Sequence, residues 1–287
     1  MRFSTLFALA ACSGAPADTD VNGEPIAPRK VLVVGWDGAK PESVIVAATP
    51  NLDQLGAWGA ISFAATTQLT HPTTSGPGWT SVLTGVAPDQ HGVLFNGLYN
   101  NRDDTWLTFM KRAHDAGLRT GVAVVWPEIA TDIIEQDASD ENWLSGEEEV
   151  ANWMVDKIEG DAFDVHFVHL DAPDHAGHAS GYYVDNPDYI EAIEESDRRL
   201  GLLLDAVEAR EGEEWLVAAT TDHGANGTGH GTLDAENQTI WTAYGQPGGT
   251  GGWDLSNASH LDVHPTVLDF LGIDVDSRGV VGTSRVP

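Results

Sequence analysis

The chain has 287 residues, with 44 acidic side chains against 14 basic ones, and its formal net charge is −30. That length suits one large α/β domain or two small ones. The 10 tryptophans and 8 phenylalanines supply the apolar material that disordered chains lack. So few basic residues exclude a nucleic-acid binder that works through a broad basic surface. The single cysteine excludes an internal disulfide and a thiolate metal cluster, which leaves histidines and carboxylates as candidate metal ligands.

The first residues have the pattern of an export signal: a mostly apolar stretch, too short to span a bilayer, leads into small residues around Cys12. Leu9, Ala10, Ala11 and Cys12 resemble a bacterial lipobox, in which the cysteine becomes lipid-modified. The alternative is an ordinary exported leader that contains a cysteine. We expect a lipoprotein-type signal peptide over residues 1–11, a flexible tether over 12–28 and one folded domain over 29–287. Lipidated Cys12 would attach the protein to a membrane of the bacterial cell envelope, in the periplasm or at the cell surface.

From residue 29 onward, the chain alternates apolar runs with amphipathic segments. Continuous apolar and β-branched runs predict strands at residues 30–36, 120–126, 165–170 and 215–220. Apolar residues at helical spacing predict helices at residues 105–116, 146–158, 188–208 and 266–271. The glycine-rich residues 245–252 predict a surface loop. The alternation predicts an α/β fold, a three-layer α/β/α sandwich around a largely parallel sheet.

Acidic residues and histidines follow three of the predicted strands. Asp37 follows the first strand, Asp171 and Asp174 follow the strand at 165–170, and Asp222 and His223 follow the strand at 215–220. In parallel sheets, ligands bind beyond the carboxyl ends of the strands. Aspartate and neutral histidine are ligands that zinc accepts when thiolates are absent. A single loop aspartate is better explained as a helix cap, but the same pattern after three strands predicts a metal site.

Further histidines are candidates to complete that site. His178 lies four residues after Asp174, so one helical turn would let both side chains reach a single ion. His230 is flanked by glycines, which allow a close backbone approach, and it is our preferred last ligand. His260 and His264, just before the predicted final helix, are the alternatives.

The candidate nucleophile is Ser75. Pro77 suits the first turn of a helix and Gly85 suits its C-terminal end. The Ser75 hydroxyl would then lie at the positive end of the helix dipole, where an alkoxide and an incoming anion are both stabilised. A neighbouring metal would lower the pKa of this hydroxyl further. The alternative is that Ser75 or Thr74 only caps the helix.

In this order the motifs resemble the alkaline phosphatase superfamily and, within it, the type I phosphodiesterase/nucleotide pyrophosphatase group. The motifs are Asp37-Gly38, Ser75 to Gly85, Pro88 to Gly92, Asp174 to His178 and Asp222 to Gly224. The resemblance covers residues 30–273 and implies an alkaline-phosphatase-like fold with a nucleophile at Ser75. It further implies two divalent metal ions, expected to be zinc, one held by Asp37, Ser75, Asp222 and His223, the other by Asp174, His178 and His230. Asn96 matches an asparagine of the group that donates to a substrate phosphoryl oxygen.

The resemblance implies a metal-dependent phosphodiesterase or phosphatase that cleaves a small-molecule phosphate ester through a phosphoseryl intermediate. The charges of two zinc ions would be balanced by Asp37, Asp174, Asp222 and ionised Ser75, which favours a monoanionic diester over a dianionic monoester. The motifs contain no lysine or arginine to clamp a dianion.

Departures from the family pattern leave alternative functions open. Trp79 stands where sulfatases have the arginine of C/S-x-P-x-R, and Pro77-Gly78-Trp79 replaces the Pro-Asn-His of nucleotide-hydrolysing members. The alternatives are a phosphotransferase, a phosphonate hydrolase or a sulfatase of the superfamily, or a catalytically silent metal-containing binding lipoprotein. Manganese or iron would also suit the ligand set.

Overall fold

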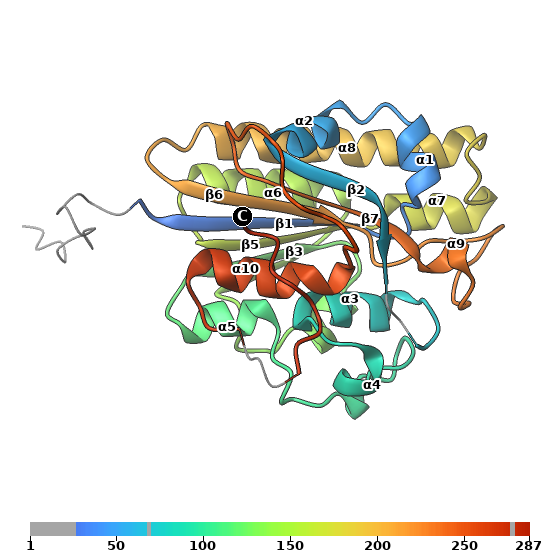
Figure 1. Cartoon of the computed structure of the whole chain (residues 1–287), viewed down its shortest axis with the longest axis horizontal. Coiled ribbons are helices and arrows are strands. Elements are labelled where there is room, and N and C mark those ends of the chain that lie inside the picture. Colours follow the sequence, from blue (N-terminus) through green and yellow to red (C-terminus); the bar gives the residue numbers. More distant parts are fainter. Residues whose placement is uncertain (1–26, 68–69, 276–278) are drawn as a thin grey trace, which may run out of the picture.

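The computed structural model describes residues 27–67, 70–275 and 279–287. The expected signal peptide, Cys12 and most of the expected tether lie outside these residues. A seven-stranded sheet in the order β2-β7-β6-β1-β5-β3-β4 runs through the centre of the described chain (Figure 1). Its strands are β1 (Arg29–Trp36), β2 (Gly59–Thr66), β3 (Thr120–Val124), β4 (Glu141–Leu144), β5 (Val165–Leu170), β6 (Glu214–Thr220) and β7 (Thr239–Gly245).

The predicted, largely parallel sheet is confirmed. The four predicted strands, β1, β3, β5 and β6, are joined by parallel pairings, and β4 extends them at one edge. At the other edge β7 pairs antiparallel with β6 and β2 pairs antiparallel with β7. The sequence did not predict β2, β4 or β7.

Helices cover both faces of the sheet, as a three-layer α/β/α sandwich requires (Figure 1). Val31 and Val33 of β1 pack into one apolar cluster with residues of α3, α5 and α10, and Leu32 and Val34 pack into another with residues of α2, α6 and α8. The helices are α1 (Pro41–Val46), α2 (Pro50–Trp58), α3 (Ser75–Thr84), α4 (Pro88–His91), α5 (Phe109–Asp115), α6 (Glu147–Glu159), α7 (Ala172–Ser180), α8 (Pro187–Glu208), α9 (Ala235–Gln238) and α10 (Val263–Leu271).

Several element boundaries differ from the prediction. The helix expected from residue 105 begins at Phe109, because the Thr108 side chain accepts a hydrogen bond from the Lys111 N–H at 3.1 Å and caps it. The final helix begins at Val263, earlier than expected. Pro28, assigned to the tether, already accepts a hydrogen bond from the Glu214 N–H at 2.9 Å. The backbone of this last tether residue is therefore already hydrogen-bonded to the start of β6.

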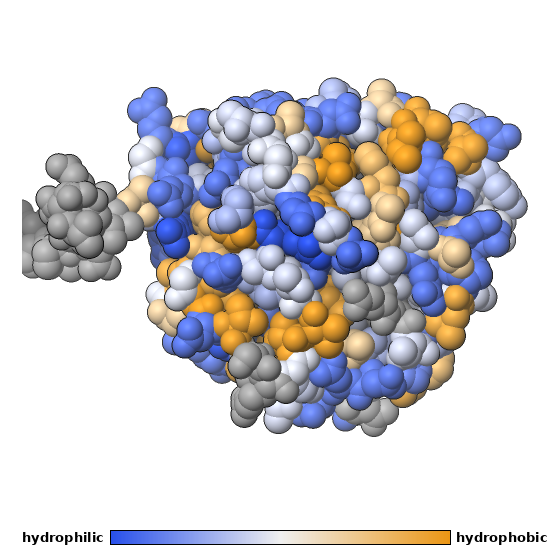
Figure 2. All heavy atoms as spheres, viewed as in Figure 1, coloured by the Kyte–Doolittle hydropathy of each residue, from blue (hydrophilic) through white to orange (hydrophobic). Residues whose placement is uncertain are grey.

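The three strands that carry the candidate ligands are direct neighbours at the centre of the sheet, in the order β6-β1-β5. Because these strands are parallel, their carboxyl ends lie at one edge. Figure 2 shows a surface of mixed polarity, with hydrophobic side chains gathered over α1 and below α10. Among the described residues, no helix has the length and apolar character needed to cross a membrane.

Candidate active site

The loops after β1, β5 and β6 bring the predicted acidic ligands together. Asp37 leaves β1 through Gly38, whose φ of 61° is the left-handed conformation that glycine adopts most readily. A Cβ atom at Gly38 would come within 2.5 Å of the Asp174 Oδ1, so the turn after β1 lies directly against the first turn of α7. Asp222 also reaches this turn, because its Oδ1 accepts a hydrogen bond from the Gly38 N–H at 3.3 Å.

Asp37, Asp222 and His223 form the first cluster, and all three are buried. The His223 Nε2 lies 3.4 Å from both Asp37 Oδ1 and Asp222 Oδ2. Each of these three atoms is buried without a hydrogen-bond partner in the part of the chain that the structure describes. Burial, together with the neighbouring carboxylates, raises the pKa of Asp37 to about 7 and that of Asp222 well above its usual range. Three converging atoms of this kind fit a bound cation.

Asp174, His178 and His230 form the second cluster. The His178 Nε2 lies 3.1 Å from His230 Nε2 and 3.4 Å from Asp174 Oδ2, and His230 Nε2 lies 3.7 Å from Asp174 Oδ1. The His178 side chain is 46% exposed, so this cluster opens to solvent. The rings of His223 and His230 stack with centroids 3.7 Å apart, which places the two clusters side by side.

The hydrogen bonds of the three histidines determine which ring nitrogen is free. His178, His223 and His230 each place Nδ1 beside a backbone carbonyl, of Thr228 at 3.2 Å, Gly224 at 3.0 Å and Thr73 at 2.7 Å, respectively. A carbonyl oxygen only accepts, so each Nδ1 carries the proton and donates. In the neutral form of these imidazoles the free lone pair is therefore on Nε2, which faces the carboxylates and is the atom that would bind a metal.

Neither alternative histidine contacts Asp174 or His178, although His260 lies near the backbone of Asp222. His264 Nδ1 donates to the Leu83 carbonyl oxygen at 2.9 Å, and its ring packs against Gly85 at the end of α3. His260 is fully buried, and no group of mutually close ligand atoms among the described residues includes it. The structure brings His230 beside Asp174 and His178, and its role as the last ligand stays a prediction.

The candidate nucleophile lies at the start of α3. The helix spans Ser75–Thr84, and Gly85, whose φ is 72°, caps its C-terminal end as the sequence predicted. Its first turn lies against the first cluster, because a Cβ atom at Gly78 would come within 2.9 Å of the Asp222 Cβ. Asn96 also meets this turn, and its Oδ1 accepts a hydrogen bond from the Gly76 N–H at 2.7 Å.

Three residues that orient the acidic ligands were missed by the sequence analysis. The Trp79 indole N–H donates to Asp37 Oδ2 at 2.7 Å, and His169 Nε2 lies 3.1 Å from the same oxygen. The Tyr182 hydroxyl donates to Asp174 Oδ1 at 2.5 Å. In the sequence, Trp79 stands out only as a departure from the sulfatase pattern and from that of the nucleotide-hydrolysing members. The position of His169, two residues before Asp171 on a buried strand, was the available signal.

Asp37, His169 and Asp171 form a further group of close ligand atoms. Burial and the charge of Asp37 raise the pKa of Asp171 to about 7. The Asp171 N–H donates to Glu147 Oε1 at 2.8 Å, which fixes the end of β5 against the start of α6. The sequence analysis named Asp171 only as a residue that follows this strand.

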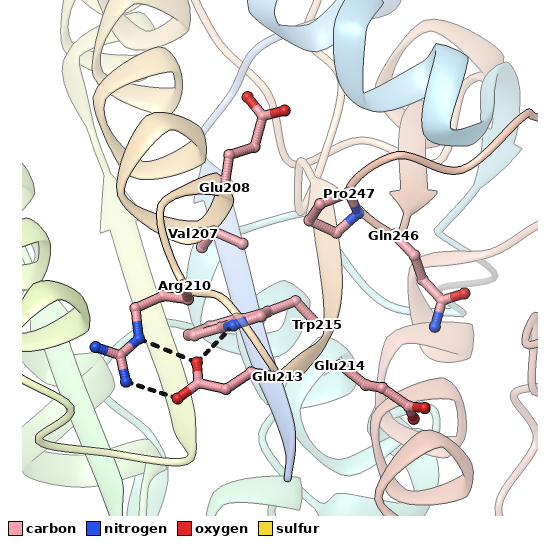
Figure 3. A pocket seen from close by; sticks show the side chains of 8 residues that line it. All are labelled: Val207, Glu208, Arg210, Glu213, Glu214, Trp215, Gln246 and Pro247. Atoms are coloured by element: carbon pink, nitrogen blue, oxygen red, sulfur yellow. Dashed lines mark hydrogen bonds and ion pairs between the residues drawn. The ribbon is translucent and has the colours of Figure 1, made fainter. Parts of the chain in front are cut away.

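A cavity of about 410 Å³ lies at the opposite edge of the sheet, where β6 begins (Figure 3). Three of its polar side chains are paired with one another: Glu213 Oε2 accepts hydrogen bonds from the Arg210 Nε–H at 3.0 Å and the Trp215 indole N–H at 2.9 Å. Figure 3 shows these three side chains joined at one side of the cavity. None of the predicted site residues lines it.

The model of the type I phosphodiesterase/nucleotide pyrophosphatase family matches residues 31–240. The chain belongs to this family. The match includes the residues of both clusters, Ser75 and Asn96, and it confirms the resemblance to the alkaline phosphatase superfamily.

A curated relative is the 2,3-bisphosphoglycerate-independent phosphoglycerate mutase of Paracoccus denitrificans (strain Pd 1222), 34% identical over 145 residues. The match covers 48% of this chain and 26% of the mutase, so the chain spans about a quarter of that relative's length.

Solved structures share the fold. The murine ectonucleotide pyrophosphatase/phosphodiesterase 5, an inactive variant in complex with AMP, has a TM-score of 0.62 and 16% identity over 88% of this chain and 97% of its own. A 2-O GAG sulfatase has a TM-score of 0.67 and 14% identity, over 90% of this chain and 73% of its own.

Proposed function

We propose that the protein is a metal-dependent phosphoric ester hydrolase that prefers diesters and uses Ser75 as its nucleophile. One observation carries this proposal: two clusters in which histidine Nε2 atoms face carboxylate oxygens lie side by side, with the N-terminal turn of α3 against the first of them. Family membership supports the reaction class.

The residues present fit two divalent cations, for which we propose zinc. Asp37, Asp222 and His223, together with Ser75, would hold one, and Asp174, His178 and His230 the other. The donor set consists of carboxylate oxygens and imidazole nitrogens, which suit zinc in a site without thiolates. Such ions, when bound, lower the pKa of a coordinated hydroxyl and stabilise charge on phosphoryl oxygens.

The chain's own residues bind and orient the reacting groups. Ser75 Oγ forms the new bond to phosphorus as the ester oxygen departs on the opposite side, and water then cleaves the Ser75 O–P bond to restore the hydroxyl. The N-terminal turn of α3 stabilises negative charge at this position. Asn96, held by the Gly76 N–H, lies close enough to this turn to orient a phosphoryl oxygen.

The charge of the site favours a singly charged substrate. The two clusters contain three carboxylates and no lysine or arginine, so their negative charge would balance two divalent ions together with ionised Ser75. A dianionic monoester would then add unbalanced charge, whereas a diester adds less. The AMP complex of the murine structural neighbour is consistent with phosphate-ester chemistry on this fold.

A Ser75→Ala variant tests the assignment. We expect the hydrolysis of bis(p-nitrophenyl) phosphate to fall by about 10³-fold or more, with metal content retained, because the nucleophile is lost. Ser81→Ala is the matched control, since Ser81 lies on the same helix and its hydroxyl contacts His91 Nε2 at 3.0 Å, away from both clusters. Full activity of Ser75→Ala would refute the role of this residue.

A panel of p-nitrophenyl esters separates the alternatives. The proposal expects the diester to be cleaved faster than p-nitrophenyl phosphate, p-nitrophenyl sulfate or a phosphonate monoester, with all activity lost in EDTA. Preferred cleavage of the sulfate would indicate a sulfatase, and product formed only with an added alcohol would indicate a phosphotransferase. Absence of turnover with metal bound would indicate a binding protein.

We also propose that the protein is exported and anchored to a bacterial envelope membrane through Cys12. The proposal rests on the lipobox-like residues before Cys12. Labelled palmitate should be incorporated by the full chain and lost in a Cys12→Ser variant. Equal labelling of both would contradict the anchor.

A further inference from the structure

The space beside Gly76, the residue after the candidate nucleophile, is filled by two polar side chains. A Cβ atom at Gly76 would lie 2.9 Å from Asn96 Oδ1 and 3.1 Å from the Tyr99 hydroxyl oxygen. The Asn96 oxygen already accepts the Gly76 N–H. Glycine at this position therefore lets the Tyr99 hydroxyl approach the first turn of α3.

The Tyr99 hydroxyl is a hydrogen-bond donor without an acceptor among the described residues. Its oxygen is buried and makes no hydrogen bond of acceptable geometry with the described residues, although the Gly97 backbone is nearby. Buried hydroxyls are normally paired, so an unpaired one beside a site indicates a missing partner. Burial, reinforced by the charges of Glu128 and Asp132, raises the pKa of Tyr99, so the phenol stays protonated and remains a donor at neutral pH.

The segment before Tyr99 is exposed to solvent. Phe95 and Leu98, in the segment before it, are 45% and 47% exposed, and Asn96 is also exposed. The Tyr99 ring itself packs against the apolar cluster beneath α3. The ring is thus anchored in the core, while its buried hydroxyl lies beside the first turn of the helix that carries Ser75.

We propose that the Tyr99 hydroxyl donates a hydrogen bond to a non-bridging oxygen of the phosphoryl group that Ser75 attacks, beside Asn96. This inference rests on the proposed function and deepens it. A phenol is a neutral donor, and it stabilises a phosphoryl oxygen without the positive charge that a dianionic monoester would require. Tyr99 thereby contributes to the preference for diesters.

The variant Tyr99→Phe tests the proposal, because it removes the hydroxyl and keeps the ring that packs in the core. We expect kcat/KM for bis(p-nitrophenyl) phosphate to fall by about 10- to 100-fold, since removal of one preorganised donor typically has an effect of this size or larger. Metal content and Tm should stay unchanged. Tyr244→Phe is the matched control, since Tyr244 is a fully buried tyrosine of β7 whose hydroxyl is also unpaired among the described residues.

Cleavage of the two isomers of a phosphorothioate diester with two different ester groups gives a second test. A purely structural role of Tyr99 would not change how the enzyme discriminates between these isomers. Sulfur is a weak hydrogen-bond acceptor, so the wild type should cleave the isomer with sulfur facing Tyr99 more slowly than the other isomer. Tyr99→Phe should reduce this discrimination between isomers, and Tyr244→Phe should retain it. Wild-type kcat/KM and unchanged discrimination in Tyr99→Phe would overturn the inference. If Ser75→Ala is inactive at the same time, the proposed function survives that result; if Ser75→Ala is fully active, the proposed function itself fails.

Discussion

Hydrogen bonds to a single carboxylate oxygen determine how Asp37 faces the first cluster. Trp79 is an obligate donor, and its indole N–H occupies Asp37 Oδ2 together with His169. The other oxygen, Oδ1, is thereby left to face His223 Nε2. Trp79 belongs to α3, so the helix that carries Ser75 also orients a candidate metal ligand.

Replacement of Trp79 by phenylalanine should weaken metal binding, because Asp37 loses its shortest orienting hydrogen bond. We expect the affinity for zinc, measured by competition with a chelator, to fall by about 10- to 100-fold. Trp153→Phe serves as the control, since Trp153 stacks on Trp143 near the edge strand β4, away from both clusters. Equal zinc affinity of Trp79→Phe and wild type would show that the indole does not orient Asp37.

The candidate ligands directly after strands could be predicted from the sequence, but the side chains that hydrogen-bond to these ligands and orient them could not. Asp37, Asp174, Asp222 and His223 stand at or just beyond strand ends, where the chain order alone reveals them. Trp79 reaches Asp37 across 42 positions of the chain, and that contact depends on how α3 docks on the sheet. A tryptophan within an apolar helix is more simply interpreted as a core residue.

At the scale of elements, the predicted strands are the buried strands of the parallel part of the sheet. Burial alone did not reveal a strand, because β7 is also buried and the sequence did not predict it. The central strands β1, β3, β5 and β6 are covered on both faces, so their sequences are continuous apolar runs. Every residue of β4 is exposed, and the short strand has no apolar pattern to recognise. The helix α7 was also missed as an element, because its nine residues carry Asp174 and His178 in place of a continuous apolar stripe.

The docking of α3 shows how elements hold the site together. A Cβ atom at Gly35 of β1 would come within 2.2 Å of the Trp79 ring, and one at Gly78 would contact Asp222. Glycine at both positions therefore allows helix and strand to approach closely enough for the Trp79–Asp37 hydrogen bond. This tight packing also explains why the first turn of α3 lies against the first cluster.

At the scale of the whole molecule, two of the acidic residues behind the net charge of −30 lie together in the candidate site. Asp37 and Asp222 are buried beside each other, and burial raises the pKa of both. In the metal-free protein their ionisation opposes folding, whereas a bound cation would favour the ionised form. Metal binding at these residues would therefore be coupled to the stability of the fold.

The pH dependence of stability in EDTA should reveal this coupling. The folded-state pKa of Asp37 is about 7 against a usual 3.8, so its favourable contribution is complete below pH 3.8 and is lost as pH rises through 7. We expect wild type to lose on the order of 2–4 kcal/mol relative to Asp37→Asn between pH 4 and 8, measured by urea unfolding. Both proteins contain the same buried histidines, so the contribution of these histidines to the pH dependence of stability cancels in the comparison. A difference independent of pH would contradict the raised pKa.

The central claim, a two-metal centre completed by His230, is tested most directly by the metal content of the purified protein. Inductively coupled plasma mass spectrometry should find two divalent ions per chain in wild type and in His264→Ala, and one in His230→Ala. A wild type without tightly bound metal would contradict the account. So would a His230→Ala variant that retains both ions while His264→Ala loses one.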